Sequence, residues 1–130
     1  MGENNTGSIL VLDDDFDIAT LIKMALQKDG HNVFSFTDPL LALEHFKLKH
    51  SIYSLVMSDL RMPNMSGFQF IQNIRLVEPR IKVLLMSAFD VTGDIEFSAH
   101  SKKHEIDGFI QKPISIKKLN GIVDEHMTSH

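Results

Sequence analysis

Five segments of strand length stand out in the pattern of hydrophobic and polar positions along the chain. They cover Ser8 to Leu12, Asn32 to Phe36, Tyr53 to Ser58, Ile81 to Met86 and Asp107 to Gln111. Most of them are nearly continuous apolar runs of about five residues, which is typical of strands that are buried on both faces of a sheet. The pattern therefore predicts five strands in the interior of the protein.

The first two predicted strands are each followed by a segment whose apolar residues recur at helical spacing. The segment from Asp17 to Gln27 stops before Gly30, and its expected inward residues are Ile18, Leu21, Ile22, Ala25 and Leu26. The next helix begins at Thr37 or Asp38, either of which can cap it, with Pro39 in the first turn. Its expected inward residues are Leu40, Leu43 and Phe46.

Three more helical segments follow the remaining strands. Ser66 and Gly67 open a helix that ends at Glu78 and Pro79, with inward residues Phe70, Ile71 and Ile74. The segment from Asp90 to Lys103 is a poorly specified helix, because it contains Gly93 and few large apolar residues. The last helix runs from about Ser115 to His126, with inward residues Ile116, Leu119, Ile122 and Val123.

Strands and helices alternate without any hairpin signal, which predicts an α/β fold with a parallel sheet covered by helices on both faces. A chain of 130 residues with 43% hydrophobic content suits one compact domain. We expect this domain to span residues 8–127, after a disordered polar tail at residues 1–7.

Composition excludes several classes of function. There is no cysteine, so disulfides, thiolate metal sites and cysteine nucleophiles do not enter the argument. No apolar run approaches the roughly 20 residues that span a bilayer, and residues 1–8 lack the features of a secretory signal, so we expect a cytoplasmic protein without membrane contact. A net charge of −4 argues against a nucleic-acid surface, which needs clustered Lys and Arg.

Polar residues of a particular kind follow four of the predicted strands. Asp13 and Asp14 follow the first strand, Asp59 the third, Ser87 the fourth and Lys112 the fifth. Because the carboxyl ends of parallel strands meet at one edge of a sheet, we expect these side chains to lie together. Three neighbouring carboxylates repel one another unless a cation joins them, and a hard cation such as Mg²⁺ suits oxygen ligands. With a Lys and a Ser nearby, this set suits phosphoryl transfer.

The fragments ILVLDDDFDI, LVMSDLRMPNMSGFQFI, LLMSAF and DGFIQKP together resemble the receiver (phosphoacceptor) domain of two-component response regulators. The resemblance covers nearly the whole chain and is closest to the stand-alone form typified by chemotaxis regulators. It implies a flavodoxin-like (βα)5 fold, in which the five parallel strands have the order 2-1-3-4-5. It also implies a signalling phosphoacceptor that catalyses only its own phosphorylation and dephosphorylation.

The resemblance assigns roles to the chemical residues. Asp59 accepts a phosphoryl group from the phosphohistidine of a sensor histidine kinase or a phosphotransfer protein. Asp14 and Asp59 supply carboxylates to Mg²⁺, Asp13 acts mainly through a bound water, and the backbone carbonyl of Arg61 is a further ligand. Lys112 pairs with the phosphoryl group, and the peptide bond before Pro113 is cis.

The resemblance also implies a switch and an output surface. Ser87 binds a phosphoryl oxygen, and Phe109 occupies the aromatic switch position. The surface that changes consists of the fourth helix, the fifth strand and the fifth helix, and it receives a downstream protein partner or a second copy in a phosphorylation-dependent homodimer. Two departures are a Ser in place of the commoner Thr at Ser87, and a segment between Ser87 and Lys112 that is a few residues longer than usual.

The residues can be compared with three other functions. A phosphatase of the aspartyl-nucleophile class would carry an acidic residue two positions after Asp59, where this chain has Arg61. A dinucleotide-binding domain would show Gly-x-Gly-x-x-Gly after the first strand, and it does not occur there. A structural domain that is never phosphorylated is a third alternative. His100 and His104, at helical spacing, could hold a transition metal, but without a third ligand we interpret them as surface residues.

Overall fold

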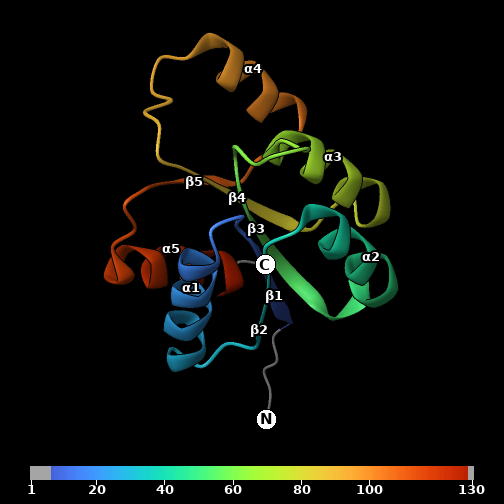
Figure 1. Ribbon diagram of the computed structural model, residues 1–130, viewed down its shortest axis with the longest axis vertical. Helices are drawn as coiled ribbons and strands as arrows, with labels where there is room; N and C mark the ends of the chain where they lie inside the picture. Colours follow the sequence, from blue (N-terminus) through green and yellow to red (C-terminus); the bar gives the residue numbers. More distant parts are fainter. Residues whose placement is uncertain (1–6, 129–130) are drawn as a thin grey trace.

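The computed structural model describes residues 7–128, in which strands and helices alternate along the sequence (Figure 1). The strands are Ser8–Leu12 (β1), Val33–Phe36 (β2), Tyr53–Asp59 (β3), Lys82–Ser87 (β4) and Gly108–Gln111 (β5). The helices are Phe16–Lys28 (α1), Pro39–Lys49 (α2), Gly67–Val77 (α3), Ile95–Lys103 (α4) and Ile116–Thr128 (α5), with a short 3-10 helix at His50–Ile52. All five predicted strands and five predicted helices are confirmed, with boundaries that differ by a few residues.

The five strands form one parallel sheet in the order β2-β1-β3-β4-β5. This confirms the expected flavodoxin-like topology. β3 lies at the centre, paired with β1 on one side and β4 on the other. Because every strand runs in the same direction, the carboxyl ends of all five lie at one edge of the sheet, and the polar residues that follow them are brought to that edge.

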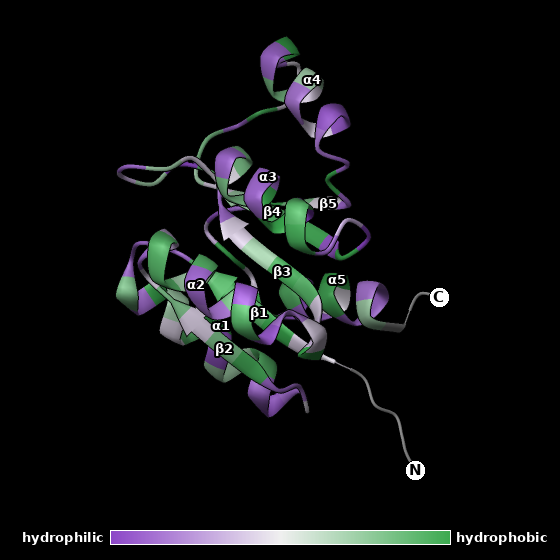
Figure 2. Cartoon of the chain, turned by 90° about the vertical axis from the view of Figure 1, so that its right-hand side faces the viewer, coloured by the Kyte–Doolittle hydropathy of each residue, from purple (hydrophilic) through white to green (hydrophobic). Residues whose placement is uncertain are grey.

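Two apolar clusters lie on the two faces of the sheet, because successive residues of a strand point to opposite faces. Ile9 and Val11 of β1 belong to the cluster that α1 and α5 cover, whereas Leu10 and Leu12 belong to the cluster covered by α2 and α3. Figure 1 shows α1 beside α5 on one side of the sheet, with α2 and α3 on the other. In Figure 2 the strands contain green segments and become pale at the arrowheads of β2 and β3, while purple segments alternate with green ones along the helices.

Local sequence signals set the beginnings of the helices. The Asp15 side chain accepts hydrogen bonds from the first N–H groups of α1, and Asp38 does the same for α2, whose first residue is Pro39. At α3, Ser66 and Gln69 form a reciprocal capping box. These caps fix the points at which the chain leaves the carboxyl edge of the sheet.

Three residues that we predicted to face inward are exposed: Leu21 by 47%, Leu40 by 60% and Ile116 by 46%. In α2 the buried face consists of Pro39, Ala42, Leu43 and Phe46. Apolar residues occur almost all round this helix, so hydrophobicity alone does not identify the face that packs. Leu21 lies beside the buried stripe of α1, and Ile116 is the first residue of α5. The expectation for these three residues was wrong.

α4 is shorter than expected and stands apart from the other helices at the top of Figure 1. It begins at Ile95 after the cap residue Asp94, and the segment from residue 90 to residue 94 is a loop. None of the residues in α4 is fully buried. Aromatic rings connect it to the rest of the domain. Between ring centroids, Phe97 lies 5.6 Å from Phe68 of α3 and 5.3 Å from Phe109 of β5.

The described chain begins at Gly7, whose N–H donates a hydrogen bond to Ser54 Oγ at 2.9 Å. Residues 1–6 of the expected polar tail lie outside the described residues. Among the helices of residues 7–128, none has the length and apolar character that crossing a bilayer requires.

Candidate functional site

Three consecutive acidic residues follow β1, and they have different environments. Asp13 is fully buried; its N–H donates to the Phe36 carbonyl at 3.1 Å, and its Oδ1 accepts from the Asp15 N–H at 2.9 Å. Asp14 is exposed. Asp15 caps α1, so its carboxylate is already engaged with the first N–H groups of that helix. Asp13 and Asp14 are therefore the acids that this strand end contributes to a site.

Asp59 is the last residue of β3 and is only 7% exposed. The next residue, Leu60, donates its N–H to the Met86 carbonyl of β4 at 2.7 Å and accepts a bond of the same length from the Gly67 N–H. A Cβ atom at Gly67 would lie 2.5 Å from the Asp59 carbonyl oxygen, which is closer than a side chain tolerates. The absence of a side chain at Gly67 therefore lets α3 start directly against the strand end that carries Asp59.

Lys112 follows β5 and reaches across to the other two strand ends. Its Nζ lies 2.7 Å from Asp13 Oδ2 and 3.4 Å from Asp59 Oδ1, and its peptide bond to Pro113 is cis. Burial lowers the pKa of Lys112, but the hydrogen bond and the charge of Asp13, together with Asp59, outweigh this effect and raise the pKa above its usual value. The ammonium therefore stays charged between two carboxylates.

The environment of Asp59 makes its ionisation less favourable than that of an ordinary carboxyl group. Burial raises the pKa of Asp59, the negative charge of Asp13 raises it further, and the ammonium of Lys112 offsets part of the increase; the resulting pKa is about 6. Asp59 is consequently ionised for the most part at neutral pH and gains a proton as the pH falls below about 6. A cation at this site would oppose that protonation.

Asp13, Asp14 and Asp59 could together hold a metal ion. One carboxylate oxygen from each of them lies within 4.8 Å of the others. Oxygen-only donor sets suit hard cations such as Mg²⁺, which takes one or two carboxylates and keeps several waters. The exposed Asp14 leaves the group open to solvent on one side, so the residues present fit a partly hydrated Mg²⁺ ion.

Ser87 is buried at the end of β4 and accepts hydrogen bonds from the loop that follows β4 and from the residue that follows β5. Its Oγ accepts a hydrogen bond from the Phe89 N–H at 3.0 Å, and its carbonyl accepts from the Lys112 N–H at 2.8 Å. The guanidinium carbon of Arg61, in the loop after β3, lies 4.3 Å above the Phe89 ring. Nothing in the sequence predicts this cation–π contact, because its two members lie in loops whose relative position hydrophobic periodicity does not determine.

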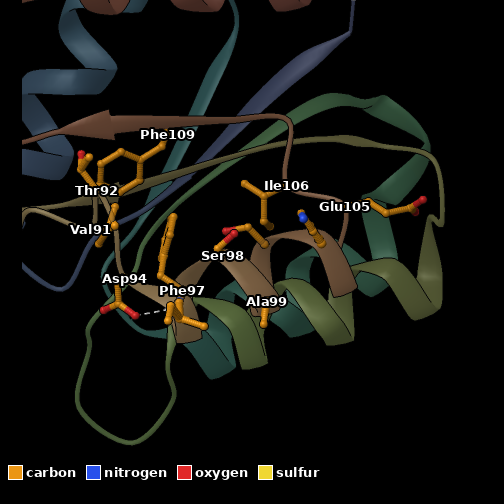
Figure 3. Close-up of a pocket in the computed structure, with 13 residues that line it drawn as sticks. Val91, Thr92, Asp94, Phe97, Ser98, Ala99, Glu105, Ile106 and Phe109 are labelled. Atoms are coloured by element: carbon orange, nitrogen blue, oxygen red, sulfur yellow. Dashed lines mark hydrogen bonds between the residues drawn. The ribbon is translucent and has the colours of Figure 1, made fainter.

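Phe109 lies on β5, outside the acidic group. It is partly buried against the cluster covered by α2 and α3, and its ring meets Phe97 of α4 edge to face. Together with Val91 and Ile106, these two rings line a hollow of ≈ 930 Å³ between α4 and β5 (Figure 3). The structure therefore brings together Asp13, Asp14, Asp59, Ser87 and Lys112. Phe109 lies outside this group, on β5 and three residues before Lys112.

His100 and His104 are not ordinary surface residues. Both rings stack on Phe68 of α3, with centroids 5.0 Å and 5.8 Å from it, and both are partly buried. Burial lowers the pKa of His104, and Lys103, His100 and Arg75 lower it further. The two histidines thus hold α4 against α3, a role that only the position of Phe68 in space reveals.

Comparison with known proteins agrees with this geometry. The sequence profile of the response regulator receiver domain matches residues 9–124. Sporulation initiation phosphotransferase F of Bacillus subtilis (strain 168) is 24% identical over 119 residues, which cover 92% of each chain. Transcriptional regulatory protein ZraR of Klebsiella oxytoca is 30% identical over 117 residues, which make up 90% of this chain and 25% of that protein. The chain thus spans about a quarter of the length of that ZraR protein.

Solved structures share the fold over the same range. Chemotaxis protein CheY4 of Vibrio cholerae superposes with a TM-score of 0.83 at 22% identity, over 93% of this chain and 98% of that one. A receiver domain protein of Clostridium thermocellum gives a TM-score of 0.82 at 24% identity, over 93% and 94% of the two chains. Because the family profile covers residues 9–124 and the acidic group lies at the carboxyl edge of the sheet, the chain belongs to the response regulator receiver domain family of two-component signalling.

Proposed function

We propose that the protein is a phosphorylation-dependent signalling switch in which Asp59 accepts a phosphoryl group from the phosphohistidine of a sensor histidine kinase or a phosphotransfer protein. One observation supports this proposal above all. The carboxylates of Asp13, Asp14 and Asp59 converge within 4.8 Å, and the Lys112 ammonium lies between two of them. A buried nucleophilic carboxylate beside a fixed cation is what acceptance of an anionic phosphoryl group requires.

In the proposed reaction, a carboxylate oxygen of Asp59 attacks the phosphorus atom and the phosphorus–nitrogen bond breaks. The electron pair of that bond returns to the imidazole nitrogen of the donor, and an acyl phosphate remains on Asp59. Lys112, at 3.4 Å from Asp59 Oδ1, is close enough to pair with the phosphoryl oxygens. Asp14, Asp59 and the Arg61 carbonyl would hold Mg²⁺, with Asp13 acting through a water. When bound, Mg²⁺ supplies positive charge next to the transferred group.

The phosphoryl group would be sensed by Ser87, whose hydroxyl can donate to a phosphoryl oxygen. Ser87 is joined to β5 by the backbone hydrogen bond from Lys112, so a displacement at Ser87 acts directly on the strand that carries Phe109. Phe109 in turn contacts Phe97 of α4. We propose that α4, β5 and α5 form the output surface, and that a downstream protein partner or a second copy of the domain docks there.

The proposal is tested by incubating the protein with Mg²⁺ and acetyl phosphate and measuring its intact mass. Wild type should gain one acid-stable, base-labile phosphoryl group, and Asp59→Asn should gain none. The matched control is Asp90→Asn, which removes an exposed carboxylate from the loop after β4 and should leave phosphorylation unchanged.

Two outcomes would replace the proposal by one of its alternatives. Continuous release of phosphate, with no adduct accumulating, would identify a phosphatase with an aspartyl nucleophile. Absence of both an adduct and turnover in wild type would identify a domain that acts without phosphorylation. An Asp59→Asn protein that still gains mass would move the acceptor to another residue.

A further inference from the structure

A second group of metal-ligating side chains lies at the edge of the sheet opposite to Asp59. It consists of Asp29 at the end of α1, His31 just before β2, and Asp124 in α5. The first two residues precede β2, so they lie at the amino end of the strands, and α5 runs back toward that end from β5. The group therefore shares no residue and no edge of the sheet with the phosphoacceptor site.

The three side chains converge on one point. His31 Nε2 lies 2.9 Å from Asp124 Oδ1 and 3.8 Å from Asp29 Oδ2, and one ligand atom of each residue lies within 4.8 Å of the others. Zinc binds nitrogen and oxygen donors at about 2.1 Å, so two donors of a tetrahedral site lie about 3.4 Å apart. The two measured separations bracket that value. A small adjustment of exposed Asp124 would equalise them.

The backbone positions these donors before any ion binds. The Asp29 N–H donates to Ala25 at the end of α1, and Gly30 follows with a φ of 97°, a left-handed conformation that turns the chain. The His31 N–H donates to the Leu26 carbonyl at 3.0 Å, and its side chain is only 13% exposed. Asp124 adjoins Val123, which is fully buried in the core. The backbone hydrogen bond of His31 and the burial of its side chain thus fix the position of the imidazole.

Asp29 and Asp124 interact directly with one another as well as with His31. The pKa of Asp29 is raised, first by its hydrogen bond with Asp124, then by burial and by the negative charge of Asp124, while His31 opposes the increase. One carboxylate oxygen of each residue lies within 4.8 Å of the other and of the imidazole nitrogen, so a single divalent cation could contact all three donors.

We propose that Asp29, His31 and Asp124 form a binding site for a divalent transition-metal ion of the zinc type, with water in the remaining positions. The donor set decides the class of ion, because an imidazole nitrogen suits Zn²⁺ and other late transition metals, whereas Mg²⁺ prefers oxygen ligands alone. The bound ion would tie the turn between α1 and β2 to α5. This inference does not depend on phosphorylation of Asp59.

Calorimetric titration with Zn²⁺ tests the site, on the 130-residue protein after it has been stripped with a chelator and placed in excess Mg²⁺. The Mg²⁺ occupies hard oxygen sites, so the remaining Zn²⁺ binding reports on nitrogen-containing ones. Wild type should bind one equivalent, and His31→Gln and Asp124→Asn should each weaken binding by at least about tenfold, since even the loss of residues that only orient metal ligands has effects of that size. The melting temperature of wild type should rise with Zn²⁺, and that of either variant should not.

Two matched variants separate this site from adventitious binding. His104→Gln removes a histidine from the pair on α4, and Asp17→Asn removes an exposed carboxylate from α1; both should bind Zn²⁺ as wild type does. Equal Zn²⁺ affinity in wild type and His31→Gln would overturn the proposal, as would loss of binding in His104→Gln or no binding in wild type. Circular dichroism of each variant without metal establishes that it folds, so a change in affinity is not mistaken for unfolding.

Discussion

The pKa of Asp59 is set by opposing effects of burial and of two neighbouring charged residues. Burial and the Asp13 carboxylate favour its neutral form, whereas Lys112 favours its charged form, and the balance leaves its pKa at about 6. In the unfolded chain an Asp titrates near 3.9. The native state therefore binds a proton on Asp59 more tightly than the unfolded state does, and holding Asp59 charged at neutral pH costs stability.

Replacing Asp59 with Asn should raise stability at neutral pH in the absence of metal. The folded-state pKa of Asp59 lies above the unfolded value, so its favourable contribution is present below about pH 4 and is lost as the pH rises through about 6. A shift of about two units corresponds to at most about 3 kcal/mol, and solvent relaxation reduces that figure. Urea unfolding in EDTA should show a gain of roughly 1–3 kcal/mol at pH 7.5 and little gain at pH 4.

The exposed carboxylate of Asp90 provides the comparison for this experiment. Its pKa is lowered by hydrogen bonds from Thr92, so Asp90→Asn should not stabilise the protein at pH 7.5. If Asp59→Asn raised the free energy of unfolding equally at pH 7.5 and pH 4, repulsion among the acidic residues would not be the cause of the stabilisation.

Replacing Lys112 with Gln should raise the pKa of Asp59 above 6. The ammonium lowers that pKa through its charge and through a hydrogen bond, and the neutral amide of Gln supplies no charge. Carbon-detected NMR titration of the Asp59 carboxyl group measures the change directly. Lys117→Gln, an exposed lysine of α5, should leave the titration as it is in wild type, and an unshifted Asp59 in Lys112→Gln would mean that the ion pair is absent in solution.

Individual site residues could be predicted from the sequence wherever strand periodicity and parallel topology determine a position. Asp13, Asp14, Asp59, Ser87 and Lys112 follow apolar strands directly, so the rules for parallel sheets place them together. The contact between Arg61 and Phe89 could not be predicted, and neither could the approach of His31 to Asp124. Both depend on how loops and helix ends meet in space, and nothing in the local sequence encodes the distance between such segments.

At the scale of elements, α4 differs from the other four helices in how it is attached. It buries no residue completely, and Phe68 of α3 holds it by contacts with Phe97, His100 and His104. Aromatic pairs are worth about 0.5–1.5 kcal/mol each beyond the area that they bury. A helix held by a few such contacts opens at a small fraction of the free energy that unfolds the whole domain.

Phe68→Ala should therefore loosen α4 while leaving the rest of the domain folded. We expect amide hydrogen exchange in residues 95–103 to become roughly tenfold faster or more, because three ring contacts worth about 0.5–1.5 kcal/mol each are lost. Exchange in β1 and β3 should change little. Leu76→Ala, on the same helix but 80% exposed, is the control. Faster exchange spread evenly over all elements would contradict a local role for Phe68.

The sequence located all five helices but did not always identify the face that packs. Where small and large residues alternate at helical spacing, as with Ala19, Ile22, Ala25 and Leu26 of α1, most of the buried stripe was predicted. In α2, Leu40 and Leu41 are exposed beside buried Ala42 and Leu43, because the sheet below decides which side packs. Amphipathic spacing also does not predict that His100 and His104 stack on Phe68. Histidine counts as polar in a hydrophobicity pattern, although its ring can pack on an aromatic side chain.

At the scale of the whole molecule, the sheet joins the acidic group to a distant surface. The hydrogen bond from the Lys112 N–H to the Ser87 carbonyl connects the ends of β4 and β5, and Phe109 of β5 connects to α4. A ligand shifts a two-state equilibrium only by its differential affinity for the two states. In the proposed switch, the hydroxyl of Ser87 is the contact that distinguishes the phosphorylated form.

Ser87→Ala should accept phosphate on Asp59 but fail to transmit it. We expect intact mass to show the adduct, whereas amide chemical shifts of β5 and α4 should change much less than in phosphorylated wild type, because the discriminating hydroxyl is missing. Sedimentation measures in parallel whether phosphorylated wild type dimerises and the variant does not. Ser51→Ala, at an exposed serine near the opposite end of β3, should respond as wild type does. Equal shifts in Ser87→Ala and wild type would remove Ser87 from the route.

One of the two apolar clusters contains residues from β1 and from α5, which lie near opposite ends of the described chain. This arrangement affects the protein while it is being synthesised. Ile9 and Val11 of β1 pack in the same cluster as Leu119, Val123 and Met127 of α5. While the ribosome has translated only the first hundred residues, α1 alone covers this face of the growing sheet, and the part that α5 covers later remains apolar and open to water. Domains fold as units during translation, and exposed apolar faces promote aggregation. The nascent chain should therefore depend on chaperone protection until α5 emerges and closes that face.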